Sequence, residues 1–198
     1  IIVDPADIPS VIDPDPAKSL LVVGGSSVLS YGMKRDFNAW LASLGESAPV
    51  KTLTELREWN LAHERAGSLK YGQARLDGSD RLDLEADRAE YEADRARDLY
   101  LNGEHGIDEV MNDLELDALL FPGSSGAGIA ARPGYPTVIV PFGRLDSTGG
   151  SWPDGFDPKP RPFGVSFTGM ACSEPRLIEL AYAFEQATMR RVAPPGMR

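Results

Sequence analysis

Three short apolar runs in the second half of the chain constrain the fold most, because each is bounded by residues that end regular structure. Residues 116–121 run into Pro122 and Gly123, and residues 137–140, rich in β-branched side chains, lie between Pro136 and Pro141. A third run spans residues 164–167. Short apolar runs bounded by proline and glycine are typical of buried strands. The sequence therefore predicts three strands between residues 116 and 167.

Helical periodicity appears on both sides of these runs. Apolar residues recur at helical spacing over residues 31–44, and Thr52 with Glu55 three positions later forms a capping box for a second helix. Residues 75–115 are acidic with a thin apolar stripe, which favours a solvated outer helix. Ser173 and Pro175 begin a last helix, and Arg190 and Arg191 suit its negative C-terminal end. The order of elements predicts an α/β protein, layered α/β/α with a mixed sheet.

Charge and composition limit the partners. The formal net charge is −10, whereas nucleic acids and anionic membranes attract clustered Lys and Arg, so neither is expected as a partner. No apolar run approaches the ~18 residues of a membrane span. Cys172 is the only cysteine, which precludes an internal disulfide and fits a reducing, cytoplasmic location. Residues 1–3 read as a strand entering a turn, and residues 20–23 as a short strand or the start of a helix. We therefore expect residues 1–198 to form a single domain or a fragment of a larger one.

Six segments, in order, resemble the C-terminal half of the amidase-signature family. No single segment is specific, but their order is hard to obtain by chance, and together they cover nearly the whole chain. One departure is Gly32, where many members carry an acidic residue. The segments are residues 31–41, residues 52–73 with Trp59-Asn60, His63 and Tyr71-Gly72-Gln73, residues 116–120, residues 134–143, residues 163–169, and residues 173–188.

This resemblance implies both a fold and a chemistry. It implies a central mixed sheet flanked by helices and, for the intact protein, hydrolysis of a carboxamide to a carboxylate and an amine or ammonia. The family needs no metal or organic cofactor. Its members use a serine nucleophile, a bridging serine in a cis peptide and a lysine base, and these lie ahead of the matched segments. The resemblance therefore implies that the chain carries no catalytic residue, is inactive alone, and meets a small amide substrate when joined to an N-terminal half.

The end of the first predicted strand is the best candidate for a substrate-pocket wall. Phe121, Pro122, Gly123 and Ser124 leave residues 116–120 at their carboxyl end, where ligands gather in open α/β sheets. A plain strand-terminating turn explains the same residues equally well.

Two serine-rich phrases leave a catalytic alternative open. Ser125, within Gly123-Ser124-Ser125-Gly126, and Ser151, at the end of residues 146–151, could be the bridging serine and nucleophile of a self-contained hydrolase, with Lys51 or Lys70 as base. Residues 134–141 lie between the phrases and fit the C-terminal pattern instead. The phrase at residues 24–27 starts like the family's Gly-Gly-Ser-Ser-Gly-Gly signature, but Val28 and Leu29 break it, so a structural turn is expected there.

A third hypothesis is a non-catalytic binding or assembly module that has kept the fold alone and can form a homo-oligomer. A partial sheet should then show unpaired edges or an apolar patch covered by a partner. Among single residues, we expect His63 to form a hydrogen bond within its helix and His105 to be exposed. No cluster has metal-ligand spacing, and Cys172 is interpreted as a small buried residue.

Overall fold

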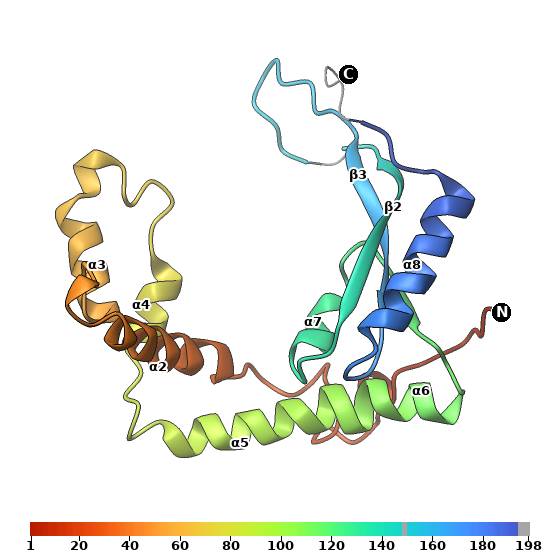
Figure 1. The fold of residues 1–198 in the computed structure, drawn as a ribbon, viewed down its shortest axis with the longest axis horizontal. Helices are drawn as coiled ribbons and strands as arrows, with labels where there is room; N and C mark the ends of the chain where they lie inside the picture. The colour runs from red at the N-terminus through yellow and green to blue at the C-terminus, as the bar shows by residue number, and fades with distance from the viewer. Residues whose placement is uncertain (148–149, 194–198) are drawn as a thin grey trace. The chain divides into compact units, whose positions relative to one another are not determined.

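The computed structural model describes residues 1–147 and 150–193, which divide into two compact units (Figure 1). One unit comprises Ile1–Val23 and Asp98–Arg198, and the other comprises Gly24–Arg97. Each is described by itself. In the described part of the chain, no helix is both long and apolar enough to cross a membrane.

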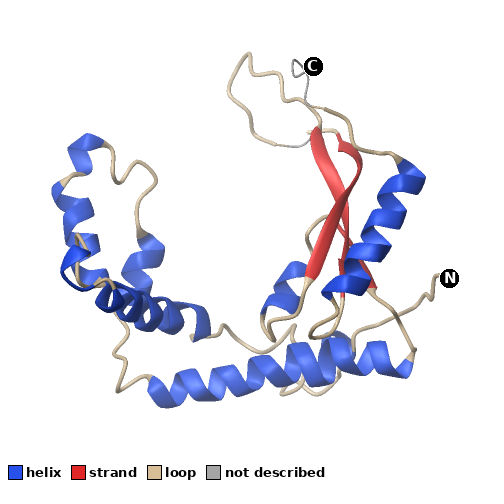
Figure 2. Cartoon of the chain, viewed as in Figure 1, coloured by secondary structure: helices blue, strands red, loops and turns tan. Residues whose placement is uncertain are grey.

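The sheet of the first unit has three strands, at the positions that the apolar runs predicted (Figure 2). They are β1 (Leu119–Pro122), β2 (Thr137–Leu145) and β3 (Arg161–Thr168), in the spatial order β1-β3-β2. Both pairings are antiparallel, so β1 and β2 run in the same direction with β3 between them. The predicted α/β class is confirmed. A mixed sheet was expected, whereas both strand pairings in the described residues are antiparallel.

Helix α8 (Glu174–Thr188) covers one face of this sheet. Leu177 and Ala181 on the helix pack against Val140 and Phe167 on the strands, and all four are buried. The predicted helix therefore exists and begins where expected. However, the Ser173 hydroxyl donates to the Met170 carbonyl oxygen at 2.7 Å and does not cap the helix.

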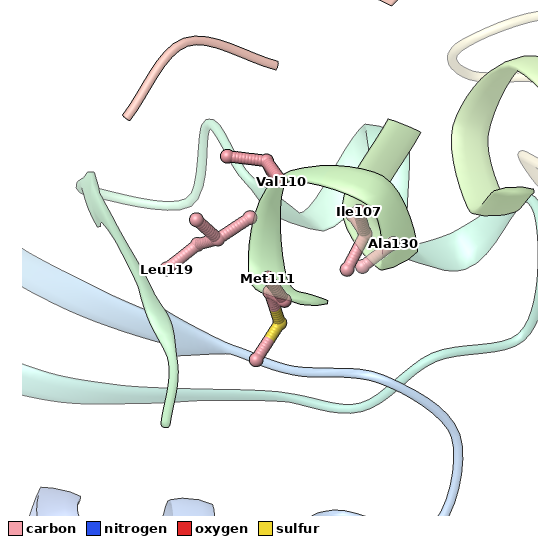
Figure 3. Packing of buried hydrophobic residues seen from close by; sticks show 5 residues of the cluster. All are labelled: Ile107, Val110, Met111, Leu119 and Ala130. Atoms are coloured by element: carbon pink, nitrogen blue, oxygen red, sulfur yellow. The ribbon is translucent and has the colours of Figure 1, made fainter. Parts of the chain in front are cut away.

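The other face packs against a second apolar cluster (Figure 3). Ile107, Val110 and Met111 contact Leu119 of β1 and Ala130, and all five side chains are buried. These residues belong to a π-helical stretch (Tyr100–Asp108), α6 (Glu109–Asp113) and α7 (Ala127–Ala131); α1 (Pro9–Ile12) contacts the π-helical stretch. Apolar layers thus contact both faces of the sheet: α8 covers β2 and β3 on one face and the second cluster covers β1 on the other, while Ile139 of β2 is 53% exposed.

The second unit is helical. It contains α2 (Val28–Ser43), two 3-10 turns (Gly45–Ser47 and Glu64–Ala66), α3 (Leu53–Ala62) and α4 (Ala74–Asp80), and most of α5 (Arg88–Leu99). The expected cap is confirmed, since the Thr52 hydroxyl accepts the Glu55 backbone N–H at 3.1 Å. Asp80 joins three helices: it binds Arg57 at 2.5 Å and Thr54 at 2.8 Å on α3, and Lys34 on α2 lies 3.6 Å away.

The expectations for residues 1–3, residues 20–23 and Cys172 were wrong. Residues 1–3 are exposed and form no strand, because no neighbouring strand pairs with them in the described residues, and residues 20–23 form a turn. Cys172 is exposed, with a φ of 62°. It lies in the turn between β3 and α8, where the backbone directs the side chain outward, so the small size of cysteine did not lead to burial.

His105 is not exposed either, because two carboxylates enclose it. Its Nε2 lies 2.8 Å from Asp13 Oδ2 and its Nδ1 lies 2.7 Å from Glu109 Oε2, while its ring stacks on Tyr100. Burial lowers the pKa of His105, but the hydrogen bonds and charges of Glu109 and Asp13 outweigh this effect and raise that pKa above its ordinary value. The pair with Asp13 fastens the N-terminal segment to the π-helical stretch.

The stability of the first unit should therefore depend on pH. Because the pKa of His105 is higher in the folded chain, the stabilisation is complete below the unfolded value of about 6.5 and is lost as pH rises through the folded value. We expect the urea concentration at the midpoint of unfolding to decrease as the pH is raised from about 6 to about 8. The variant His105→Gln should lose this pH dependence, and His63→Gln should keep it. Equal pH dependence in both variants would show that the pairing contributes nothing.

Candidate functional site

The candidate site is the turn that joins β1 to α7. Gly123 has a φ of 59°, a left-handed conformation that glycine adopts without steric cost. Its N–H donates to the Gly164 carbonyl oxygen at 2.8 Å, and its own carbonyl oxygen accepts the Ser166 hydroxyl of β3. The Ser125 hydroxyl donates to the Pro122 carbonyl oxygen at 2.8 Å. Hydrogen bonds to the central strand thus hold the turn in one conformation.

The four predicted pocket residues meet different environments in this turn. Phe121 is half-buried and packs against the cluster around Ile107, whereas Gly123 is half-buried beneath the ring of Phe163. Pro122 and Ser124 are exposed. The turn therefore presents the anchored ring of Phe121 and the exposed hydroxyl group of Ser124, and both could contact a ligand.

Phe121 also lines a cavity of about 830 Å³. The cavity lies between the N-terminal segment, β1 with the residues before it, and α8; its lining includes Ile2, Val3, Leu120, Phe167 and Arg176. Hydrogen bonds to Asp117 and Glu179 raise the pKa of Arg176. Asp4, Glu115 and Asp117 line the cavity as well, so its wall combines charged and apolar side chains. Its size falls in the range of ligand pockets. The assignment of residues 121–124 to a substrate pocket remains a prediction.

In the described residues, no contact joins the side chains of the serine-hydrolase alternative to one another. The Ser125 hydroxyl uses Pro122, and the Lys51 ammonium donates to the Gly45 carbonyl oxygen at 2.8 Å. Lys70 lies over the ring of Tyr71, and Ser151 is exposed. Thr148 and Gly149 of the second serine phrase lie outside the described residues. A serine nucleophile needs a base within hydrogen-bonding reach, and these contacts supply none.

The other candidate residues from the sequence make hydrogen bonds that stabilise the local fold. The backbone N–H of Ser27 donates to Asp94 at 2.6 Å just before α2 begins, and residues 24–27 form an irregular segment where a turn was expected. Nδ1 of His63 donates a hydrogen bond to the Trp59 carbonyl oxygen at 2.7 Å, which confirms the expected hydrogen bond to its helix. Among residues 1–147 and 150–193, no group of three or more His, Cys, Asp or Glu is placed to hold a metal ion.

Both outer strands of the sheet have an open edge. β1 and β2 each pair only with β3 within the described residues, so one row of backbone N–H and C=O groups on each strand has no strand partner. Open edges bind further strands readily. The feature expected of a partial sheet, whether completed by the rest of an enzyme or by an assembly partner, is thus present.

A second cavity, of about 440 Å³, was not anticipated. Arg144 of β2 and Arg190 and Arg191 after α8 line it. The sequence showed only the pair at 190–191, which we assigned to the end of the helix. Arg144 is distant in the sequence, and only the fold brings it to the same cavity.

The chain is similar to part of known amidases in sequence and in structure. No family model matches the chain. A probable amidase of Arabidopsis thaliana is 31% identical over 180 residues, which cover 88% of this chain. Native peptide amidase from Stenotrophomonas maltophilia is similar in structure, with a TM-score of 0.73 and 30% identity over 95% of this chain. An amidase family protein from Bacillus anthracis has a TM-score of 0.70 and 25% identity over 88% of this chain.

These matches cover only part of each relative. The chain spans 32% of the Arabidopsis protein, 36% of the peptide amidase and 31% of the Bacillus protein, or about a third of their lengths. The predicted resemblance to part of an amidase, and its fold, are confirmed.

Proposed function

Because this chain is homologous to about a third of an amidase, we propose that it is the C-terminal portion of an amidase-signature enzyme. In that role it supplies scaffold and part of the substrate pocket to an enzyme that hydrolyses a carboxamide to a carboxylate and an amine or ammonia. The catalytic serines and lysine come from the part of such an enzyme that lies outside the match. The observation that carries the proposal is the agreement of sequence and structure with amidases over nearly all of this chain and a third of theirs.

The open sheet edges support the scaffold role. A strand from the remaining part of the enzyme can add to β1 or β2 by backbone hydrogen bonds, which removes the exposed edge. The large cavity beside β1, with exposed Ile2 and Leu120 at its rim, offers apolar surface to the same added part. Burial of this surface stabilises the joined protein in proportion to the apolar area removed from water.

The turn after β1 supports the pocket role. Its backbone is fixed by Gly164 and Ser166, so Phe121 and Ser124 are held in place before a ligand arrives. Preorganised contacts bind a ligand without the cost of ordering the loop. A substrate's apolar part would contact Phe121, and its polar part would form a hydrogen bond with Ser124.

A chimera tests the pocket role. The matching third of Stenotrophomonas peptide amidase is replaced by this chain, and hydrolysis of a peptide amide is followed by ammonia release. We expect Ser124→Ala and Phe121→Ala to raise KM about tenfold, because each removes a contact made equally to substrate and transition state. Ile178→Ala, on the exposed side of α8, should leave KM unchanged. An active chimera in which Ser124→Ala and Phe121→Ala both keep the parental KM would contradict the pocket assignment.

The assembly module remains the second candidate, favoured by the same open edges. It predicts that the chain alone forms a dimer or larger oligomer of defined size and that the chimera has no amidase activity. Light scattering coupled to size exclusion, together with the chimera assay, separates the two hypotheses.

A further inference from the structure

The cavity of about 440 Å³ combines an apolar lining with three arginines. Ile139 and Pro141 of β2 and Phe163 of β3 contribute apolar surface. Arg144 lies farther along β2, and Arg190 and Arg191 belong to the segment that returns from α8 toward these strands (Figure 1). A concave site with apolar walls and a few convergent polar groups is typical of small-molecule binding.

The arginines at this cavity have no acidic partner among residues 1–147 and 150–193. No salt bridge joins Arg144, Arg190 or Arg191 to a carboxylate of the described residues. In contrast, Arg57 and Arg176 each bind two carboxylates. The chain has 30 acidic and 20 basic residues, so carboxylates are plentiful. Three guanidinium groups at one cavity repel one another unless an anion lies among them.

The guanidinium groups also have N–H donors left to bind a ligand. Arg144 donates one hydrogen bond, to the Ala193 carbonyl oxygen at 3.1 Å, and Arg190 lies over the ring of Phe142 at 5.7 Å. These contacts fix the two side chains at the cavity without neutralising them. A guanidinium group has five N–H donors, and two of them can bind both oxygens of one carboxylate.

We propose that this cavity binds a small monocarboxylate with an apolar tail. The carboxylate pairs with the arginines, and the tail lies against Ile139, Pro141 and Phe163. This site is built by β2, β3 and the segment after α8, and it does not rest on the proposed amidase function.

Isothermal titration calorimetry of the full chain with octanoate at low salt tests this site. Octanamide is the matched probe, because it has the same tail and no charge. We expect octanoate to bind at least about tenfold more tightly than octanamide, and its affinity to fall as salt rises. Arg144→Gln and Arg191→Gln should each weaken octanoate binding about tenfold, since each removes a charge-assisted hydrogen bond.

Arg176→Gln serves as the control, because Arg176 is exposed, lies at the other cavity and is already paired with carboxylates. Its octanoate affinity should match that of the parent chain. The proposal is overturned if octanoate and octanamide bind equally, if neither binds, or if Arg191→Gln weakens binding no more than Arg176→Gln does. Arg191 is exposed, so its replacement leaves the fold intact.

Discussion

Leu177→Ala is expected to lower the free energy of unfolding of the first unit by about 2–5 kcal/mol. Leu177 is completely buried between α8 and the sheet, where it packs with Val140 and Phe167. Truncation to alanine removes apolar contacts and leaves a cavity, because the strands on one side and the helix backbone on the other cannot close over it. Urea unfolding followed by circular dichroism measures the change.

The neighbouring residue of the same helix provides the control. Ile178 is 58% exposed, so Ile178→Ala should change the free energy of unfolding by less than about 1 kcal/mol. The two variants differ in which face of α8 they alter. Similar losses for both, or a loss below about 1 kcal/mol for Leu177→Ala, would mean that α8 does not cover the sheet as described.

Gly126→Ala is expected to destabilise the turn after β1 by about 1–3 kcal/mol. A Cβ atom at this position would lie 2.2 Å from Cδ2 of Phe121, far inside van der Waals contact. The backbone of Gly126 is in an ordinary right-handed conformation, so the cost is steric and not conformational. Since Phe121 packs on the cluster around Ile107, its ring can move away only by disturbing that cluster. Thermal unfolding measures the loss, and near-ultraviolet circular dichroism reports the aromatic environment.

Gly128→Ala is the matched control two residues farther on. No atom lies within 4 Å of a Cβ built there, and Gly128 lies inside α7, where alanine is favoured over glycine by up to about 1 kcal/mol. We expect Gly128→Ala to be neutral or stabilising. If both substitutions have the same effect, Gly126 and Phe121 are not in close contact in solution, and the turn after β1 is not a preorganised pocket wall.

The elements that sequence predicted well are those with a local signal. The strands follow from apolar runs bounded by Pro122, Pro136 and Pro141, and α3 follows from the pairing of Thr52 with Glu55, which lie within one helical turn. Such signals do not depend on residues far along the chain. By contrast, residues 1–3 have strand-like composition but no strand beside them, and strand formation requires that partner.

The environments that sequence missed depend on distant residues. His105 is enclosed by Glu109 one helical turn away, but also by Asp13, which the fold brings to it from the N-terminal segment. Cys172 is exposed because of the backbone turn in which it lies, not because of its side chain. For the candidate site, sequence predicted where β1 ends, yet the contacts of Gly126 with Phe121 and of Arg144 with the segment after α8 required coordinates.

We propose that this chain supplies scaffold and pocket surface but not the activated serine that cleaves an amide. Ammonia release from a peptide amide should therefore be undetectable for residues 1–198 alone, and should appear once the chain replaces the matching third of a peptide amidase. Ser125→Ala and Ser151→Ala should leave the rate of that chimera unchanged. Hydrolysis by the purified chain alone, abolished by Ser151→Ala, would contradict this account and establish the self-contained serine hydrolase in its place.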